Sequence, residues 1–301
     1  MAPFEDNRPG MDAETFRRLR DLVYDHCGIL IRDDMKFVME RRLWPRAEAL
    51  GLGDFAAYDR FLRFDPTRKA ELELAVEALT THETYFFREP IQLEAFSEEL
   101  LPQLAQRNAA SRRLRIWSAG CSSGEEAYTI AMLVHASGLF AGWDVEVYGT
   151  DISRRVLATA RRAEYGPSSL RATSERDRQR FFEPVEGPST ATPPLASTSA
   201  RLRVRPELRA LVSFGHLNLL DREMGGLVAR MDAVFCRNVL IYFDLPARRR
   251  VLSLFYDRLV EGGFLLLGHS ESLLTLASDF ELVHLKKDLV YRRPLRTRAT
   301  P

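Results

Sequence analysis

Apolar residues recur at helical spacing throughout the first 80 residues of the chain. Asp12 suits the N-cap of the first helical segment, and Gly28 suits its C-terminal end. Pro45 lies inside the second segment and is expected to kink that helix or to mark its edge. The pattern predicts a small all-helical domain over residues 11–80. Its helices are expected near residues 12–28, 33–50, 55–64 and 68–79.

The pattern changes after this region. One more helical segment covers residues 90–107, and short apolar runs then alternate with amphipathic helices. Alternation of this kind predicts an α/β fold with a mainly parallel sheet and helices on both faces, here over residues 81–293. The predicted strands are residues 114–117, 145–151, 211–217, 231–236, 264–268 and 289–292. The predicted helices among them begin at Glu125 or cover residues 153–162 and 246–259.

A stretch of different composition interrupts the α/β alternation. Residues 174–182 predict a short polar helix, and the alternating residues 202–206 suit an exposed hairpin strand. Between them, residues 184–200 are rich in Pro, Ser and Thr and predict a loop. We therefore expect a small β-hairpin subdomain over residues 182–210, inserted in the sheet domain. Residues 294–301 predict a basic tail.

The turn after the first predicted strand indicates the kind of ligand. A dinucleotide site needs three spaced glycines and a helix N-terminus left open for pyrophosphate. Here Gly120 and Gly124 lack the glycine between them, and Glu125 and Glu126 begin the helix. Two carboxylates repel a pyrophosphate but attract an ammonium group. The next strand ends in Asp151, an acid placed to bind both ribose hydroxyls. These features favour a nucleoside that carries an amino acid, of which S-adenosylmethionine (SAM) is the common one.

Composition narrows the function classes. The chain has 43 basic and 42 acidic side chains, so no overall field attracts nucleic acid. Cys27, Cys121 and Cys236 are widely separated and suggest neither a disulfide framework nor a zinc site, and no other metal site is expected. The N-terminus lacks the apolar core of a signal peptide, and no apolar run approaches the roughly 20 residues that span a bilayer. We predict a soluble cytoplasmic protein.

The segment between the two predicted domains allows two interpretations. Its adjacent aromatics Tyr85, Phe86 and Phe87 follow neither helical nor strand spacing. In one interpretation these aromatics seal the domain junction. In the other, Thr84 and Arg88 reach into the ligand pocket. The sequence pattern alone leaves both open.

Several motifs together resemble one family, the CheR-type chemoreceptor glutamate methyltransferases. The likeness covers roughly residues 12–293, and the motifs occur in the family's order. It implies a Rossmann-like class I SAM-dependent methyltransferase domain with an N-terminal all-helical domain and a small inserted β-subdomain. The implied activity is methyl transfer from SAM to receptor glutamates, in chemosensory adaptation. The matching stretches are residues 80–89, 117–126, 150–153, 218–220, 235–244 and 268–271.

The resemblance also implies which residues bind SAM or its product S-adenosylhomocysteine. In this interpretation Glu126 pairs with the methionine ammonium, and Asp151 accepts hydrogen bonds from the ribose. Arg88 is suited to clamp a carboxylate, either the cofactor's or the substrate glutamate's. Asn218 and Leu219 suit the edge and face of adenine. The implied contact positions are His82, Thr84, Arg88, Glu126, Asp151, Asn218, Leu219, Cys236 and Arg237.

The resemblance leaves little acid–base chemistry for the protein to supply. A glutamate carboxylate is already ionised at neutral pH, so catalysis reduces to positioning and desolvation of the attacking oxygen. Tyr242 and Arg88 are the residues expected to hold that oxygen. Tyr242 could instead cap a strand with its hydroxyl outward. The backbone of Cys236 and Arg237 is expected beside the methionine moiety, while the Cys236 side chain suits a small buried apolar position.

Two features depart from the family pattern. His82 occupies a position where asparagine is familiar, although both side chains offer a donor and an acceptor. The long segment 184–200 replaces a compact, glycine-patterned hairpin turn. We therefore predict no tethering to a peptide at the receptor's C-terminus. Recognition is expected to rest on Arg41, Arg42 and Arg46, facing the receptor's cytoplasmic helical bundle. The alternative for these arginines is a solvated helix face. A monomer is the default expectation.

Two other function classes remain as alternatives. One is a SAM-dependent methyltransferase for a small molecule or a nucleic acid, which requires a deep apolar pocket or a basic stripe with aromatics. The other is a SAM-binding adaptor without catalysis. Arg88 and Tyr242 argue against the adaptor, and the balanced charge argues against nucleic acid.

Overall fold

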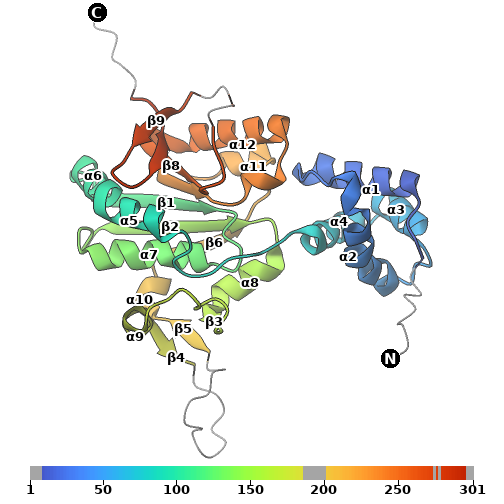
Figure 1. Ribbon diagram of the computed structural model, residues 1–301, viewed down its shortest axis with the longest axis horizontal. Helices are drawn as coiled ribbons and strands as arrows, with labels where there is room; N and C mark the ends of the chain where they lie inside the picture. The colour runs from blue at the N-terminus through green and yellow to red at the C-terminus, as the bar shows by residue number, and fades with distance from the viewer. Residues whose placement is uncertain (1–8, 186–200, 274–275, 277–278, 296–301) are drawn as a thin grey trace, which may run out of the picture. The chain divides into compact units, whose positions relative to one another are not determined.

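The computed structural model describes residues 9–185, 201–273, 276 and 279–295 of the chain. The chain divides into two compact units (Figure 1). The first, called the helical unit, runs to Thr81 and includes Tyr242–Ala247. The second, called the sheet unit, consists of His82–Ile241 and the chain from Arg248 onward.

The helical unit has the helices that the apolar spacing predicts. Asp12 caps the first helix by accepting from the backbone N–H groups of Glu14 and Thr15, and Gly28 ends it in the left-handed conformation. The second helix continues through Pro45, so the alternative in which Pro45 marks its edge is wrong. The proline removes only one backbone hydrogen bond, and Leu43 and Ala47 on either side of it stay fully buried. The helices are α1 (Ala13–Cys27), α2 (Lys36–Ala49, after a 3₁₀ turn at Asp33–Met35), α3 (Phe55–Phe64) and α4 (Arg68–Leu79).

The sheet unit contains the predicted parallel sheet. Its strand order is β6-β2-β1-β7-β8-β10-β9. The first five strands are parallel, and β10 is antiparallel to both of its neighbours, β8 and β9. Between β1 and β7 the order of the strands reverses, which makes this a topological switch point. The strands are β1 (Arg113–Ala119), β2 (Asp144–Asp151), β6 (Val212–His216), β7 (Met231–Cys236), β8 (Leu259–Leu267), β9 (Glu281–His284) and β10 (Leu289–Arg292).

Helices cover both faces of the sheet. Neighbouring residues of a strand point to opposite faces, and β1 shows this with Ile116 and Trp117. Ile116 is buried in a core cluster with Ile130 of α7 (Glu125–Ser137). Trp117 packs edge-to-face on Phe255 of α12 (Leu245–Arg258), with ring centroids 5.3 Å apart. The α/β fold class predicted from the sequence is confirmed.

The predicted helix over residues 90–107 contains a change of helix type. It begins as α5 (Pro90–Ala95), passes through a π-helical turn at Phe96–Leu100, and ends as α6 (Leu101–Arg107). The Phe96 ring lies against Phe235 of β7, with centroids 5.0 Å apart. This contact holds the helix beside the strands that carry the site.

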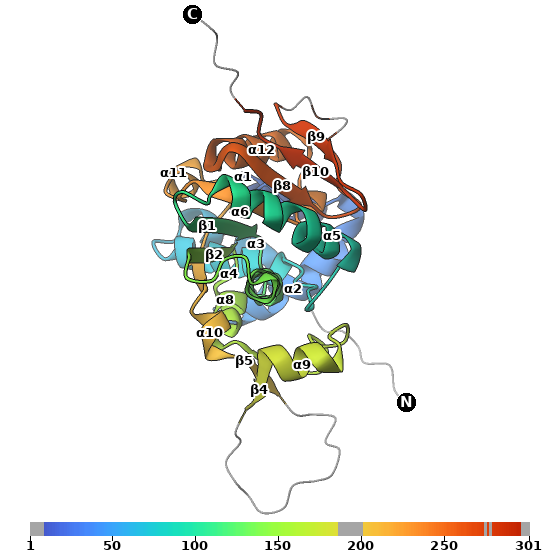
Figure 2. The same ribbon diagram turned by 90° about the vertical axis from the view of Figure 1, so that its left-hand side faces the viewer.

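The inserted region forms a small sheet of its own, with strand order β3-β5-β4. Figure 2 shows α9 beside its strands β4 and β5. The sequence pattern predicted α9 and β5 but missed β3, and it also missed α10, α11 and β9. Segment 186–200 of the predicted loop lies outside the described residues. The elements are α8 (Arg154–Arg162), β3 (Glu164–Tyr165), α9 (Glu175–Phe181), β4 (Phe182–Pro184), β5 (Leu202–Val204), α10 (Pro206–Arg209) and α11 (Arg222–Gly226).

Within the described residues, no helix is long and apolar enough to cross a membrane.

Candidate cofactor-binding site

The site begins at the turn that follows β1. Gly120 and Gly124 have positive φ angles of 82° and 94°. A Cβ atom on Gly124 would approach Ala160 Cβ to 2.8 Å, so the turn packs against α8 too closely for a side chain. The backbone N–H of Ser122 donates to Asp151 Oδ2 at 2.9 Å. The turn therefore joins the carboxyl end of β1 to that of β2.

Asp151 at the end of β2 has the geometry expected of a hydroxyl acceptor. It is 7% exposed, and its other oxygen Oδ1 accepts from the Ser153 N–H at 2.9 Å. Each oxygen thus receives one hydrogen bond from the backbone and keeps a second lone pair. Burial raises the pKa of Asp151, while the hydrogen bond from Ser153 and the charge of His82 act in the opposite direction. A ligand with paired hydroxyls would satisfy the remaining lone pairs.

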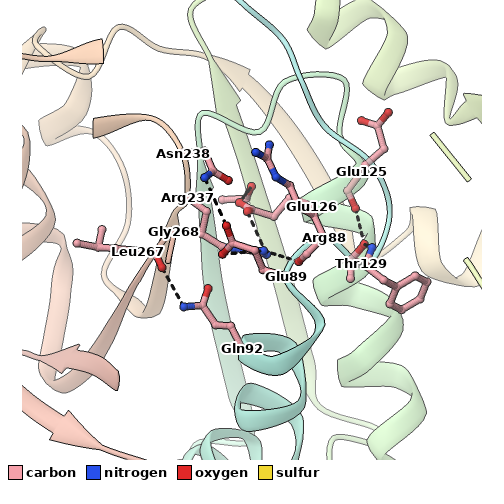
Figure 3. A network of polar contacts seen from close by, with 12 residues as sticks. Arg88, Glu89, Gln92, Glu125, Glu126, Thr129, Arg237, Asn238, Leu267 and Gly268 are labelled. Carbon is pink, nitrogen blue, oxygen red and sulfur yellow. Dashed lines mark hydrogen bonds and ion pairs between the residues drawn. The ribbon is translucent and has the colours of Figure 1, made fainter. Parts of the chain in front are cut away.

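Glu125 and Glu126 do not act as a pair, which corrects the expectation that both attract the ligand. The carboxylate of Glu125 accepts from the hydroxyls of Ser123 at 2.7 Å and Ser169 at 2.8 Å. Glu126 accepts from Ser118 at 2.7 Å, and its second oxygen lies 3.6 Å from Arg237 Nη1. In Figure 3 Glu126 lies near Arg88 and Arg237, whereas the Glu125 carboxylate points away from them. Only Glu126 remains as an acceptor for an ammonium group.

The charge on Glu126 is incompletely compensated. Burial raises the pKa of this carboxyl, and the nearby charge of Arg237 and the Ser118 hydrogen bond only partly offset that effect. A separation of 3.6 Å from Arg237 is too long for a good hydrogen bond. A buried carboxylate in this state gains from a further cationic partner. This is the electrostatic demand that the ammonium group of an amino acid meets.

Arg237 lies just after β7 and links the polar groups of Figure 3. Its side chain is 3% exposed. Its Nη2 donates to the backbone carbonyl of Arg88 and lies 3.4 Å from Glu89 Oε2. The neighbouring Cys236 is fully buried, and burial raises the pKa of its thiol, which favours the neutral form. These facts suit a small apolar position for Cys236.

The linker over residues 82–88 is anchored within the sheet unit, and neither interpretation of its sequence is tested by its contacts. Phe86 is fully buried and makes edge-to-face contacts with Tyr165 at 4.8 Å and Phe182 at 5.0 Å. It therefore packs on the inserted small sheet. Arg88 donates from Nη1 to the carbonyl of Glu83 at 2.6 Å, and its charge lowers the pKa of Glu126. The linker is thus held by aromatics while Arg88 acts electrostatically on the site.

Two more of the expected contact residues follow β6. The backbone N–H of Leu217 donates to the carbonyl of Asp151 at 3.0 Å, which places this segment at the same edge of the sheet. Asn218 accepts from the N–H of Leu220 at 3.1 Å, and Leu219 is 8% exposed. The carboxyl ends of β1, β2, β6 and β7 therefore gather most of the residues named from the sequence.

Four of the expected residues, Tyr242 and three arginines, belong to the helical unit. The carbonyl of Tyr242 accepts from the N–H of Leu30 at 2.9 Å. Arg46 pairs with Glu71 at 2.6 and 3.0 Å. Arg42 donates to the carbonyls of residues 79 and 80 at 2.7 and 3.1 Å, and Arg41 is exposed. Of the three arginines, two thus have contacts within their own unit.

Sequence reasoning missed the role of Glu271. This carboxylate accepts from the backbone N–H groups of Asn238 and Gly268, both at 2.8 Å. Asn238 follows Arg237 and has a φ of 60°. A signal was present, because an acid follows three residues after a glycine at the end of a predicted strand. Asn238, one of the partners of Glu271, lies 33 residues earlier in the chain, so sequence spacing alone does not reveal the contact.

The residues present fit SAM. A buried, loosely paired carboxylate suits an ammonium group, and Asp151 suits a ribose. The Ser122 hydroxyl is buried at this edge without a hydrogen-bond partner, as is the side-chain oxygen of Asn238. An acidic first helical turn does not suit a pyrophosphate. Within the described residues, no group of three or more His, Cys, Asp or Glu side chains could hold a metal ion.

Known proteins match almost the whole chain. Residues 82–289 match the SAM binding domain of CheR methyltransferase, and residues 14–80 match its all-alpha domain. The chain is 33% identical to chemotaxis protein methyltransferase 2 of Vibrio cholerae, over 93% of this chain and 92% of that protein. It is 37% identical to the chemotaxis protein methyltransferase of Salmonella typhimurium, over 89% and 86% of the two chains. The resemblance, the fold class and the cofactor expected from the sequence are confirmed. The chain belongs to the CheR methyltransferase family, and its sheet unit is that family's SAM-binding domain.

Proposed function

We propose that this protein transfers the methyl group of SAM to glutamate side chains of a chemoreceptor, forming methyl esters. The observation that carries this proposal is the buried Glu126, whose second oxygen is only loosely paired with Arg237. In this proposal the Glu126 carboxylate binds the ammonium group of the cofactor's amino acid at the switch point of the sheet. The relatives named chemotaxis protein methyltransferases support a receptor as the substrate.

Each residue at the sheet edge has a distinct proposed task in cofactor binding. Bound SAM supplies an electrophilic methyl group on a sulfonium. Glu126 holds the ammonium, and Asp151 accepts from the ribose hydroxyls through the lone pairs that Ser122 and Ser153 leave open. The further contact residues in this proposal are His82, Thr84, Asn218, Leu219, Cys236 and Arg237.

On the substrate side we propose that Arg88 and Tyr242 position the attacking carboxylate. The carboxylate is ionised at neutral pH, because its ordinary pKa is about 4.3. No general base is therefore required, and the rate depends on orientation and on exclusion of water. Arg88 offers a planar, permanently charged donor, and Tyr242 offers a hydroxyl.

For receptor recognition we propose the basic face of α2, with unequal contributions. Arg46 already makes a two-bond ion pair with Glu71, which partly neutralises its charge. Arg42 donates to two backbone carbonyls at the end of α4. Arg41 is the exposed member and should contribute most to docking an acidic receptor surface. In this proposal the protein acts as a monomer and needs no C-terminal receptor tether.

The experiment is transfer from labelled SAM to membranes that contain the chemoreceptor. Incorporation that is released by mild base identifies an ester, since N-methyl groups survive that treatment. Label that resists base, or that enters nucleic acid or a small molecule, would contradict the proposal. Binding of SAM without any transfer would indicate an adaptor.

A further inference from the structure

The loop after β7 is fastened by one carboxylate. This loop, residues 237–241, follows the end of β7, and Tyr242 comes next in the chain. Glu271 Oε2 accepts from the N–H of Asn238 at 2.8 Å, and Oε1 accepts from the N–H of Ile241 at 3.2 Å. The same Oε2 also accepts from the N–H of Gly268 at 2.8 Å. A single side chain thus holds both ends of the loop and the turn that follows β8.

The local backbone is built around this carboxylate. Asn238 has a positive φ of 60°, a conformation that costs free energy for most residues and that asparagine tolerates. A Cβ atom on Gly268 would meet Glu271 Oε2 at 2.8 Å and the backbone nitrogen of Asn238 at 2.9 Å. Only glycine therefore lets the turn approach the loop this closely. Burial raises the pKa of Glu271, and the backbone hydrogen bonds oppose that rise, so these bonds stabilise the ionised form.

The loop is adjacent to the cofactor site at one end. Arg237 reaches the carbonyl of Arg88 and lies 3.4 Å from Glu89, and Asn238 Nδ2 donates to Glu89 at 3.4 Å. Through the hydrogen bond from Arg237 to the Arg88 carbonyl, a shift of the backbone at Asn238 would disturb Arg88, which we propose positions the attacking carboxylate. Small displacements of groups around a reacting centre cost as much as about a hundredfold in rate.

We propose that Glu271 is a positioning residue for methyl transfer: its carboxylate fixes loop 237–241 and thereby sets Arg237, whose side chain holds the backbone of Arg88. This inference rests on the proposed function, because it assigns Glu271 to that reaction. Glu271 acts through the backbone of the loop and touches neither the cofactor nor the substrate. Its effect should therefore fall on kcat more than on SAM affinity.

The test compares Glu271→Gln with Asp232→Asn in the full chain. Asp232 is a matched control, since it is 7% exposed and accepts from the backbone N–H of Arg115 at 2.8 Å at the other end of β7. In Glu271→Gln we expect kcat to fall by about thirtyfold, with the SAM dissociation constant changed by less than about threefold. Hydrogen exchange at the amides of Asn238 and Ile241 should quicken in this variant alone. Asp232→Asn should lower stability and leave all three readouts near those of the parent protein.

A second variant guards against a folding defect. Gly268→Ala pushes on the same carboxylate without removing it, and it should reproduce the loss of kcat in a milder form. The inference is overturned if Glu271→Gln keeps its kcat, or if its losses merely match those of Asp232→Asn. Faster exchange with unchanged kcat would also overturn it. If the parent protein methylates no receptor, the proposed function fails by itself, while the exchange data still show whether Glu271 holds the loop.

Discussion

Buried carboxylates in the two units have different kinds of partner. In the helical unit Glu71 accepts two hydrogen bonds from Arg46, at 2.6 and 3.0 Å, and one from the Tyr58 hydroxyl at 2.7 Å. In the sheet unit the second oxygen of Glu126 lies 3.6 Å from Arg237. The first arrangement is saturated, whereas the second keeps room for another cation. The difference separates a carboxylate that stabilises the fold from one that is available to a ligand.

Asp151, like Glu126, is available to a ligand, and its removal should weaken SAM binding the most. Asp151→Ala deletes two acceptors for the ribose hydroxyls in a buried position, which we expect to weaken SAM binding about a hundredfold. Calorimetric titration measures the loss. Asp144→Ala changes the exposed first residue of the same strand and should bind SAM as the parent protein does. Near-parental affinity in Asp151→Ala would contradict the proposed site.

Glu71 should show the opposite behaviour. Glu71→Gln removes the charge that pairs with Arg46, and the Glu71 side chain is only 6% exposed. Because the Arg46 side chain is 29% exposed, we expect the free energy of unfolding in urea to fall by only about 2 kcal/mol. SAM affinity should stay within about twofold, since the saturated pair has no role in cofactor binding. Glu48→Gln on the exposed side of α2 is the control for stability. A large loss of SAM affinity in Glu71→Gln would break the distinction between the two carboxylates.

The pH dependence of SAM affinity should show that the carboxylates of the cofactor site must ionise. Burial raises the pKa of Glu126 and of Asp151. A carboxyl with a higher pKa in the folded state than in the unfolded chain holds its proton to higher pH. The folded protein without cofactor therefore loses stability as the pH rises from the pKa in the unfolded chain to the pKa in the folded state. Bound SAM favours both ionised forms, so its affinity should rise with pH across this window.

The window begins at the ordinary carboxyl pKa of about 4 and extends upward from it, because both pKa values are raised. On acidification into it we expect SAM affinity to fall on the order of fivefold per pH unit. Calorimetry at neutral and at mildly acidic pH checks this. An affinity that does not change with pH would show that neither carboxylate has to ionise for binding.

His82 should produce the smallest effect. Its charge lowers the pKa of Asp151, as does that of His216. Because burial and the backbone hydrogen bond from Ser153 act more strongly on this pKa than His82 does, His82→Asn should change SAM affinity by no more than about threefold. Loss of this contribution in the variant leaves the pKa of Asp151 higher than in the parent protein. The variant should therefore lose affinity more steeply on acidification, and parallel pH profiles would contradict this role.

The sequence predicted the features that depend on neighbours along the chain. The cap at Asp12, the glycine turn and the alternation of strands and helices along the chain all follow from local spacing. Strand β3 was missed because its two residues, Glu164–Tyr165, are too short to show a period. Strand β9 was missed because three of its four residues are exposed, so no buried alternation marks it.

The division of labour between Glu125 and Glu126 could not be predicted from spacing. Adjacent residues on a helix point in different directions, but their partners come from elsewhere. Ser169, which satisfies Glu125, lies 44 residues further along the chain. Arg237 approaches Glu126 from the end of another strand. The partner of Arg46 is likewise 25 residues away. Charge pairing of this kind is a property of the fold and is absent from the local pattern.

The most direct test of the account titrates SAM into two variants that differ by one position, Glu126→Gln and Glu125→Gln. The account predicts that Glu126→Gln weakens SAM binding about tenfold, because one charge-assisted contact is lost. Glu125→Gln should bind within about twofold of the parent protein, because its carboxylate already serves Ser123 and Ser169. Equal losses in the two variants, or a larger loss in Glu125→Gln, would contradict the central claim that the loosely paired carboxylate receives the cofactor.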